Sequence, residues 1–216
     1  MKHNFTLVEL LVTVGIIAIL AGLVIPAVIS SQNQGRITQA KSDMNAIKLA
    51  LKSVETTYGK IINTGKDLAD IQKSTFGDQL EINGKNEDNK KIYKAFIAEL
   101  SDPNNSALSN RNFNTRKIKF LDPSADYDPN KAYNYVDPND GKESQPDQWI
   151  DPWGNAYNIV IDLKFRGYVT VGGKNRAGSF QIFSSGPNGE PEDGKNEDQG
   201  DTSTDKSYDD IATWHK

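Results

Sequence analysis

Cysteine is absent from this 216-residue chain, and the only histidines are His3 and His215. The first absence excludes disulfide bonds and thiolate metal sites, and the second leaves almost no imidazole for catalysis. Basic charge is not in excess either, because the formal net charge is −4. A general nucleic-acid-binding protein normally presents a basic face, so we expect no nucleic-acid partner.

Long apolar runs are also missing, with one exception near the N-terminus. Residues 5–29 read FTLVELLVTVGIIAILAGLVIPAVI, and Glu9 carries the only charge among them. About 20 apolar residues at a rise of 1.5 Å each are enough to cross the hydrocarbon of a bilayer. The rest of the chain is hydrophilic but long enough for one modest core. We therefore expect one water-facing domain on a single membrane helix.

A short polar leader, residues 1–4, precedes this run, and its Lys2 predicts that the leader stays in the cytoplasm while the bulk is exported. Glu9 is anomalous, because a carboxylate within a membrane helix costs about 2.5–3.5 kcal/mol. If the chain were cut before Phe5, the new α-amino group of a neighbouring copy would be a suitable partner. The alternative is that Glu9 reaches the lipid headgroups from the helix end.

The helical pattern continues beyond the membrane, since residues 30–58 form an amphipathic stretch with apolar positions three and four apart. Gly59 is a natural stop, and Pro26 and Gly35 are the expected bends. The narrow stripe could be a coiled-coil seam, but covering a small sheet is the favoured use. Its members are Ile37, Ala40, Met44, Ile47, Leu51, Val54 and Tyr58.

The middle of the chain is less regular. Residues 66–74 predict a short helix, residues 77–89 a loop and residues 91–100 a second amphipathic helix. Ile118 and Phe120 suggest a short strand. The Asp-, Pro-, Asn- and Tyr-rich stretch 122–148 predicts a surface excursion.

The C-terminal part predicts a small sheet. Residues 151–155 read DPWGN, a dense turn signal that carries Trp153 as an aromatic anchor. Strands are expected at 157–163, 168–171 and 179–184, as an antiparallel meander of about three strands. The stripe of the first helix can cover one face of this meander. The predicted fold class is therefore α+β.

The stretch 186–210 is strongly acidic, with nine carboxylates opposed only by Lys195 and Lys206. Such a segment repels itself and lacks apolar residues. A hard divalent cation with six to eight oxygen ligands could order it. The alternative is a solvated acidic tail, and no EF-hand pattern is present.

Several of these motifs together resemble the type IV pilin and type II secretion pseudopilin superfamily, and its major pseudopilin branch most closely. The N-terminal match is FTLVE at residues 5–9, followed by the apolar run and Pro26. The C-terminal match is DPWGNAY at 151–157, FSSGPNG at 183–189 and YDDI at 208–211. The span of about 60–150 is longer than in standard major pseudopilins.

The resemblance implies a type IV pilin-like fold with four parts: a leader at 1–4, a filament-core helix at 5–29, an amphipathic helix at 30–58 and a periplasmic domain at 59–216. A prepilin peptidase would cut between Asn4 and Phe5 and N-methylate Phe5. Asn4 stands where the family usually has Gly. Glu9 would then pair with the N-terminus of a neighbouring copy during assembly.

The resemblance also implies one structural calcium ion in the C-terminal loop. The corresponding ligand positions are Asn188, Asp209 and Asp210, with a backbone oxygen of Phe183. The loop is longer than in typical members, so Asp198 or Asp201 would replace a usual ligand.

The implied function is that of a structural, non-enzymatic subunit of a type II secretion pseudopilus. Its implied partners are further copies of itself, minor pseudopilins, the prepilin peptidase, and the inner-membrane assembly platform with its ATPase. The implied location is the inner membrane, with the N-terminus in the cytoplasm and the domain in the periplasm. One alternative is a surface pilin for adhesion, motility or DNA uptake. A more remote one is a membrane-anchored enzyme with a carboxylate pair as acid and base.

Overall fold

The computed structural model describes residues 7–62, 75–76, 78–83, 87–104, 114–123, 127–128, 135–136, 143–144, 148–187, 189 and 210–213. The chain consists of two compact units, residues 1–38 and residues 39–216.

The first helix, α1, spans Leu7–Tyr58 without interruption. It therefore passes through Pro26 and Gly35, where the sequence predicts bends, as one continuous helix. Within the first unit its large apolar side chains are exposed, and none of its most apolar 18-residue window is buried. In the part of the chain that the structure describes, α1 alone is long and apolar enough to cross a membrane.

The expected stop of α1 at Gly59 is confirmed. Gly59 has φ +73°, a left-handed conformation that suits a residue without a Cβ. Its N–H donates a 2.8 Å hydrogen bond to the carbonyl of Glu55, which closes the last turn.

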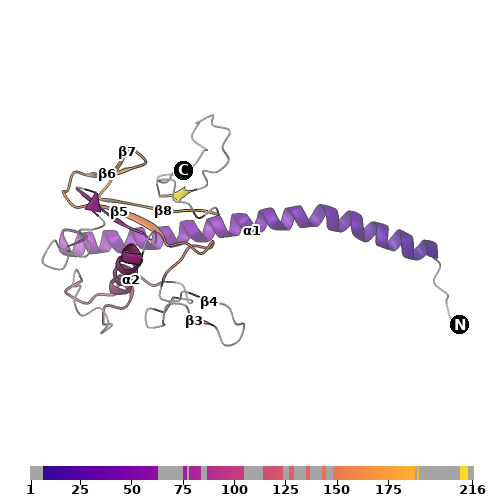
Figure 1. Ribbon diagram of the computed structural model, residues 1–216, viewed down its shortest axis with the longest axis horizontal. Helices are drawn as coiled ribbons and strands as arrows, with labels where there is room; N and C mark the ends of the chain where they lie inside the picture. The colour runs from indigo at the N-terminus through magenta and orange to yellow at the C-terminus, as the bar shows by residue number, and fades with distance from the viewer. Residues whose placement is uncertain are drawn as a thin grey trace. The chain divides into compact units, whose positions relative to one another are not determined.

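The second unit is built on an antiparallel five-stranded sheet with the order β1-β2-β5-β8-β9 (Figure 1). The strands are β1 Thr75–Phe76, β2 Gln79–Ile82, β5 Asn158–Asp162, β8 Phe180–Ser184 and β9 Ile211–Ala212. β5 pairs with β2 on one side and with β8 on the other, so it is the centre of the sheet.

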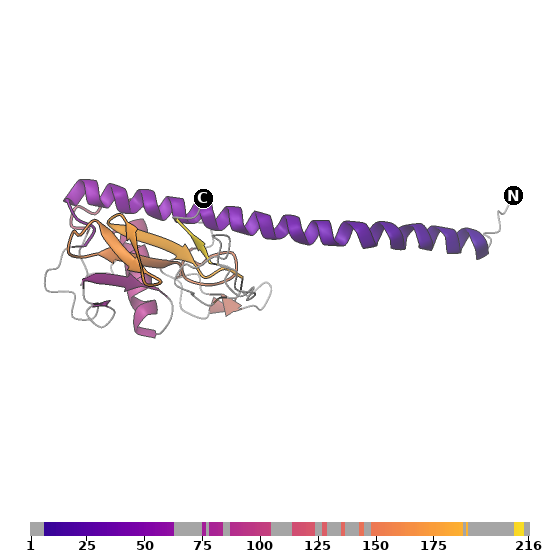
Figure 2. The same ribbon diagram turned by 90° about the horizontal axis from the view of Figure 1, so that it is seen from above.

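One face of the sheet packs against the C-terminal part of α1 and against α2, which spans Glu87–Ser101 (Figure 2). The register places the apolar side chains of three neighbouring strands on this face. They are Leu80, Ile82, Ile159, Ile161 and Ile182, all buried. The stripe of α1 supplies Ala40, Met44, Ile47, Leu51 and Val54, also buried. The expected α+β, pilin-like fold is confirmed, and so is the use of the stripe to cover a sheet.

The opposite face is covered by a hairpin of β6 Tyr168–Val171 and β7 Lys174–Ala177. Val169 and Val171 of β6 form a buried apolar cluster with Val160 and Phe183. The predicted meander is therefore wrong in its pairing, because β6 pairs with β7 while β5 pairs directly with β8. The reason is that β5 is buried along its whole length, and its second face needs a cover of its own.

Other expectations differ from the structure. The predicted loop at 77–89 contains β2 and the start of α2, since Leu80 and Ile82 supply the alternation of a half-buried strand. The predicted strand at Ile118 and Phe120 is absent from the described residues 114–123. Instead, Phe120 and Leu121 donate backbone hydrogen bonds to the carbonyl of Leu100 at the end of α2.

The stretch 122–148 contains a short hairpin of β3 Tyr135–Val136 and β4 Glu143–Ser144. The helix expected at 91–100 is confirmed within α2. The one expected at 66–74 lies outside the described residues.

Candidate functional site: the junction of two turns

The DPWGN segment forms a tight turn organised by the side chain of Asp151. Its Oδ1 accepts hydrogen bonds from the backbone N–H of Trp153 at 3.0 Å and of Asn155 at 2.8 Å. The backbone closes the same turn, because the N–H of Asp151 donates to the carbonyl of Asn155 at 2.7 Å. Gly154 has φ +97°, which explains the glycine at this position.

The Asp151 turn is joined to the turn that follows β8. The hydroxyl of Ser184 donates a 2.6 Å hydrogen bond to Oδ2 of Asp151, and it accepts one from the N–H of Gly186 at 3.1 Å. Asn155 approaches the same turn closely, since a Cβ on Gly189 would lie 3.1 Å from its Oδ1. The two C-terminal motifs are thus parts of one junction.

The same region is fastened to α1 by Tyr157. Its hydroxyl donates a 2.9 Å hydrogen bond to Oδ2 of Asp43, and Gln39 donates one of 2.9 Å to Oδ1. Asp43 and Tyr157 are both buried. The first helix therefore receives a polar contact directly beside the junction.

Burial dominates the electrostatics of these groups. It raises the pKa of the Asp43 carboxyl, although the hydrogen bonds from Tyr157 and Gln39 oppose the shift. It also raises the pKa of Asp151, against the hydrogen bonds from Ser184 and the turn N–H groups. The pKa of Tyr157 is raised by burial and then by the nearby Asp43 charge, so its phenol stays a neutral donor.

The aromatic anchor beside this turn is Trp149 rather than the expected Trp153. Trp149 is buried and makes an edge-to-face contact with Tyr157, with ring centroids 6.1 Å apart. Its carbonyl accepts a 2.5 Å hydrogen bond from the hydroxyl of Tyr93 in α2. Trp153 is only half-buried. Sequence reasoning missed Asp43, Tyr93 and Trp149. The available signal was for Tyr93, which shares one face of its helix with Phe96, Ile97 and Leu100, whereas Asp43 falls at a polar position of α1.

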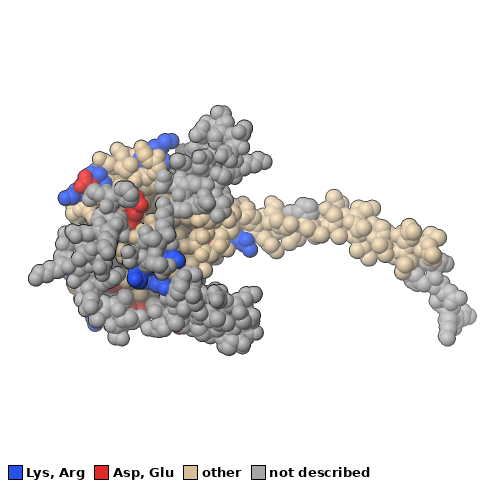
Figure 3. Space-filling model, viewed as in Figure 1, with Lys and Arg blue, Asp and Glu red and all other residues tan. Residues whose placement is uncertain are grey.

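Of the residues predicted to matter for assembly and processing, only Glu9 is described. Glu9 lies in the first turn of α1. The side of the N-terminal half of α1 that is visible in Figure 3 carries no charged side chain. Asn4 and Phe5 lie outside the described residues.

Two of the six predicted calcium ligands are described. Asp210 is buried and directly precedes Ile211, the β9 partner of Ser184. Phe183 lies in β8 one position before Ser184. Asn188, Asp198, Asp201 and Asp209 lie outside the described residues. Among the residues that the structure describes, no three acidic or imidazole side chains form a metal cluster.

The two described positions differ in how well they fit a calcium ion. A buried carboxylate such as Asp210 is a suitable hard oxygen donor. The backbone carbonyl of Phe183 is less suitable, because of the direction in which it points. Neighbouring residues of a strand direct their carbonyls to opposite sides of the strand. Ile182 accepts from the N–H of Thr213 on the β9 side, so we expect the Phe183 carbonyl to face β5.

Comparison with known proteins gives one informative match. Over 50 residues the chain is 51% identical to the type II secretion system core protein G of Pseudomonas aeruginosa. The match lies in the N-terminal part and covers 23% of this chain and 35% of that protein, so it spans about a third of the relative's length. No family model matches the chain, and no solved structure matches significantly. The resemblance to the pseudopilin superfamily is confirmed over this N-terminal part.

Proposed function

We propose that this chain is a structural subunit of a type II secretion pseudopilus. The N-terminal match to the core protein G is the observation that carries the proposal. The match lies in the N-terminal part of the chain, as does the exposed apolar part of α1, and both fit a membrane-anchored protein. An exposed apolar helix surface of this length indicates contact with lipid or with other protein surfaces, and copies of the same helix would satisfy it. Many copies packed through this surface would form the core of a short filament.

The mechanism that we propose is mechanical. A prepilin peptidase cuts before Phe5, and Glu9 pairs with the new N-terminus of a neighbouring copy. Subunits added at the inner membrane then extend a rod that moves cargo toward an outer-membrane pore, while the domains stay in the periplasm. The chain would contribute the position of Glu9 in the first turn of α1 and the folded unit formed by residues 39–216.

We also propose that calcium orders the acidic C-terminal segment. Asp210 would hold the ion together with Asp209, Asn188 and one of Asp198 or Asp201. The ion would supply positive charge to a segment whose carboxylates otherwise repel one another. Asp210 lies beside β8, so the cation would tie this segment to the junction of the two turns.

Two measurements on the full chain, expressed together with the secretion machinery, test the proposed function. Mass spectrometry should find a mature N-terminus at Phe5, and electron microscopy should show filaments. Glu9→Leu should still insert and be cleaved but should no longer assemble, whereas the control Thr13→Val, in the same helix, should assemble normally. An intact leader, or normal filaments from Glu9→Leu, would contradict the proposal.

A further inference from the structure

Three lysines form a row along one flank of α1. Lys41, Lys48 and Lys52 follow one another at spacings of seven and four residues, which places their side chains on the same side of a helix. All three are exposed, and Lys52 pairs with Glu55 at 2.7 Å. Among the residues that the structure describes, Lys41 and Lys48 have no hydrogen-bond or ion-pair partner. The lysine row therefore carries two uncompensated positive charges.

The lysine row lies on the side of α1 that faces β8. The ammonium of Lys52 lies 5.4 Å from the ring centre of Phe180, the first residue of that strand. The last residue of β8, Ser184, belongs to the junction of the two turns, which Tyr157 fastens to Asp43. The strand therefore runs back along α1, from the Lys52 end of the row toward its Lys41 end, and it lies beside α1 in both views (Figures 1 and 2).

The acidic segment starts and finishes at this end of β8. On one side its chain continues from Gly189, which lies close to Asn155 of the junction. On the other side it returns at Asp210, directly before Ile211 of the edge strand β9. Both ends therefore lie beside the Lys41 end of the row. The 20 intervening residues, 190–209, can reach every lysine of the row, since each residue extends by up to about 3.3 Å.

The charges of the row and of the segment are complementary. Residues 190–209 carry eight carboxylates and only two lysines. The proposed calcium site would use two of these carboxylates, so several remain for other partners. The acids of α1 itself cannot take their place, because Asp43 is buried and Glu55 already pairs with Lys52.

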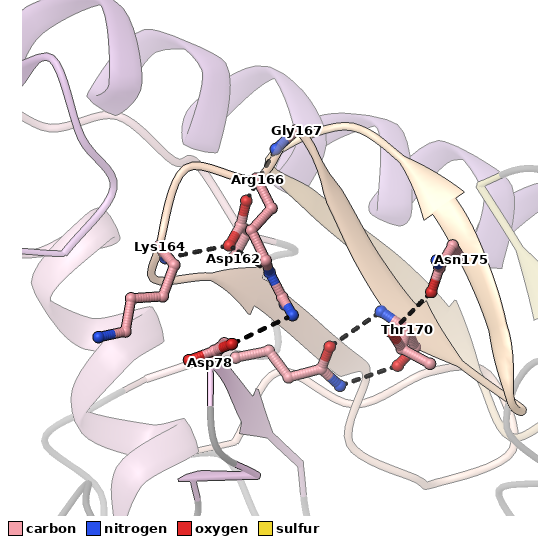
Figure 4. A network of polar contacts seen from close by, with 8 residues as sticks. Asp78, Asp162, Lys164, Arg166, Gly167, Thr170 and Asn175 are labelled. Carbon is pink, nitrogen blue, oxygen red and sulfur yellow. Dashed lines mark hydrogen bonds and ion pairs between the residues drawn. The ribbon is translucent and has the colours of Figure 1, made fainter.

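The arginine of the β5–β6 turn is less available to such a segment. The Nε of Arg166 lies 3.3 Å from the buried carboxylate of Asp162, and a terminal nitrogen lies 3.6 Å from the carboxylate of Asp78 (Figure 4). Its positive charge is therefore compensated within the fold, in contrast to the charges of the lysine row.

We propose that residues 190–209 dock on the lysine row of α1 in their own chain, with Lys41 and Lys48 as the main contacts. The inference concerns the unit of residues 39–216 and goes beyond the proposed function, because it requires no assembly. The row supplies positive charge to the segment in addition to any cation. Exposed ion pairs are individually weak and are screened by salt, so the docking depends on the summed charge.

Carbodiimide cross-linking of the wild-type chain in detergent tests this contact. The reagent joins a lysine directly to a carboxylate where the two touch. At low salt, with calcium and with EGTA alike, we expect links from Lys41 or Lys48 to residues 190–209, with a several-fold lower yield at about 0.5 M salt. Lys174 is exposed at the β6–β7 hairpin and should form no such link.

Mixing isotope-labelled with unlabelled chains separates links within one chain from links between two. We expect links within one chain only. Links that form only between chains, or a wild-type chain without any link from the row to the segment, would overturn the proposal. None of these outcomes requires a filament, so the proposed function is tested separately.

Charge reversal provides a second measurement. The double variant Lys41→Glu with Lys48→Glu should release the segment and raise the rate of tryptic cleavage after Lys195 by about threefold or more. Adding Glu192→Lys with Asp193→Lys should restore the wild-type rate, and neither residue is a proposed calcium ligand.

The control Lys91→Glu with Lys174→Glu makes the same change in net charge at exposed positions of α2 and β7. It should leave the cleavage rate unchanged. Equal cleavage rates for the two double variants would overturn the proposal.

Discussion

The hydroxyl of Tyr157 donates a 2.9 Å hydrogen bond to the carboxylate of Asp43, which lies 114 residues earlier in the chain. This contact joins the last residue of the DPWGNAY motif to the first helix. Both side chains are buried, so the contact is shielded from water. A buried carboxylate needs such a donor, because an unsatisfied charge in the interior is costly.

Tyr157→Phe should therefore destabilise the domain. The variant keeps the ring and its contact with Trp149 but leaves Asp43 without its strongest donor. We expect a loss of about 1–3 kcal/mol in the free energy of unfolding, measured by urea denaturation in detergent. Tyr168→Phe is the matched control, since its ring stacks under Arg166 and it should change stability by less than about 0.5 kcal/mol. Equal effects of the two substitutions would contradict this role of Tyr157.

The stability of the domain should depend on pH through Asp43. The folded pKa of Asp43 is raised above the value of 3.8 for an isolated Asp. Between the unfolded and the folded pKa, the folded state therefore binds more protons than the unfolded state. Its contribution to stability is complete below the unfolded pKa and is lost as the pH rises through the folded pKa. Asp43→Asn should flatten this dependence, which denaturation between about pH 3 and 8 would measure. A slope identical to that of the wild type would contradict the assignment to Asp43.

Asp151→Ala should disconnect the junction of the two turns. It removes the acceptor of the Trp153 and Asn155 N–H groups and of the Ser184 hydroxyl. Because these donors are partly or fully buried, we expect a loss of about 2–4 kcal/mol in unfolding free energy. Asp122→Ala, at an exposed ion pair with Lys119, is the control and should cost less than about 1 kcal/mol. Hydrogen exchange of the backbone amides of residues 184–186 should rise only in the first variant.

Calcium removal should lower the melting temperature if the ion orders the acidic segment. Binding at a hundred times the dissociation constant stabilises a fold by about 2.7 kcal/mol, which EGTA would remove. Mg²⁺ should restore the melting temperature poorly, because it demands tighter octahedral geometry. Asp210→Asn should lower the calcium-bound melting temperature and weaken its response to EGTA. A wild-type melting temperature that changes with neither calcium nor EGTA would contradict the proposed calcium site.

Local sequence patterns by themselves determine the position of α1 and of the turn at 151–155. The apolar run, the stripe from Ile37 to Tyr58 and the stop at Gly59 predicted α1 almost to its last residue. They succeed because helix periodicity and a glycine C-cap are properties of neighbouring residues. The turn at 151–155 follows for the same reason, since Asp151 caps its own turn.

Tertiary structure alone decided the strand order and the buried polar contacts. Nothing local distinguishes β6 as a cover for Val160 and Phe183 from β6 as a member of the main sheet, because both arrangements bury the same valines. Likewise, Asp43 reads as one of the polar positions of an amphipathic helix. Only the arrival of Tyr157 from the far end of the domain makes it a buried acceptor. Periodicity reports which face of an element is buried, whereas the identity of the buried partner depends on how distant segments pack.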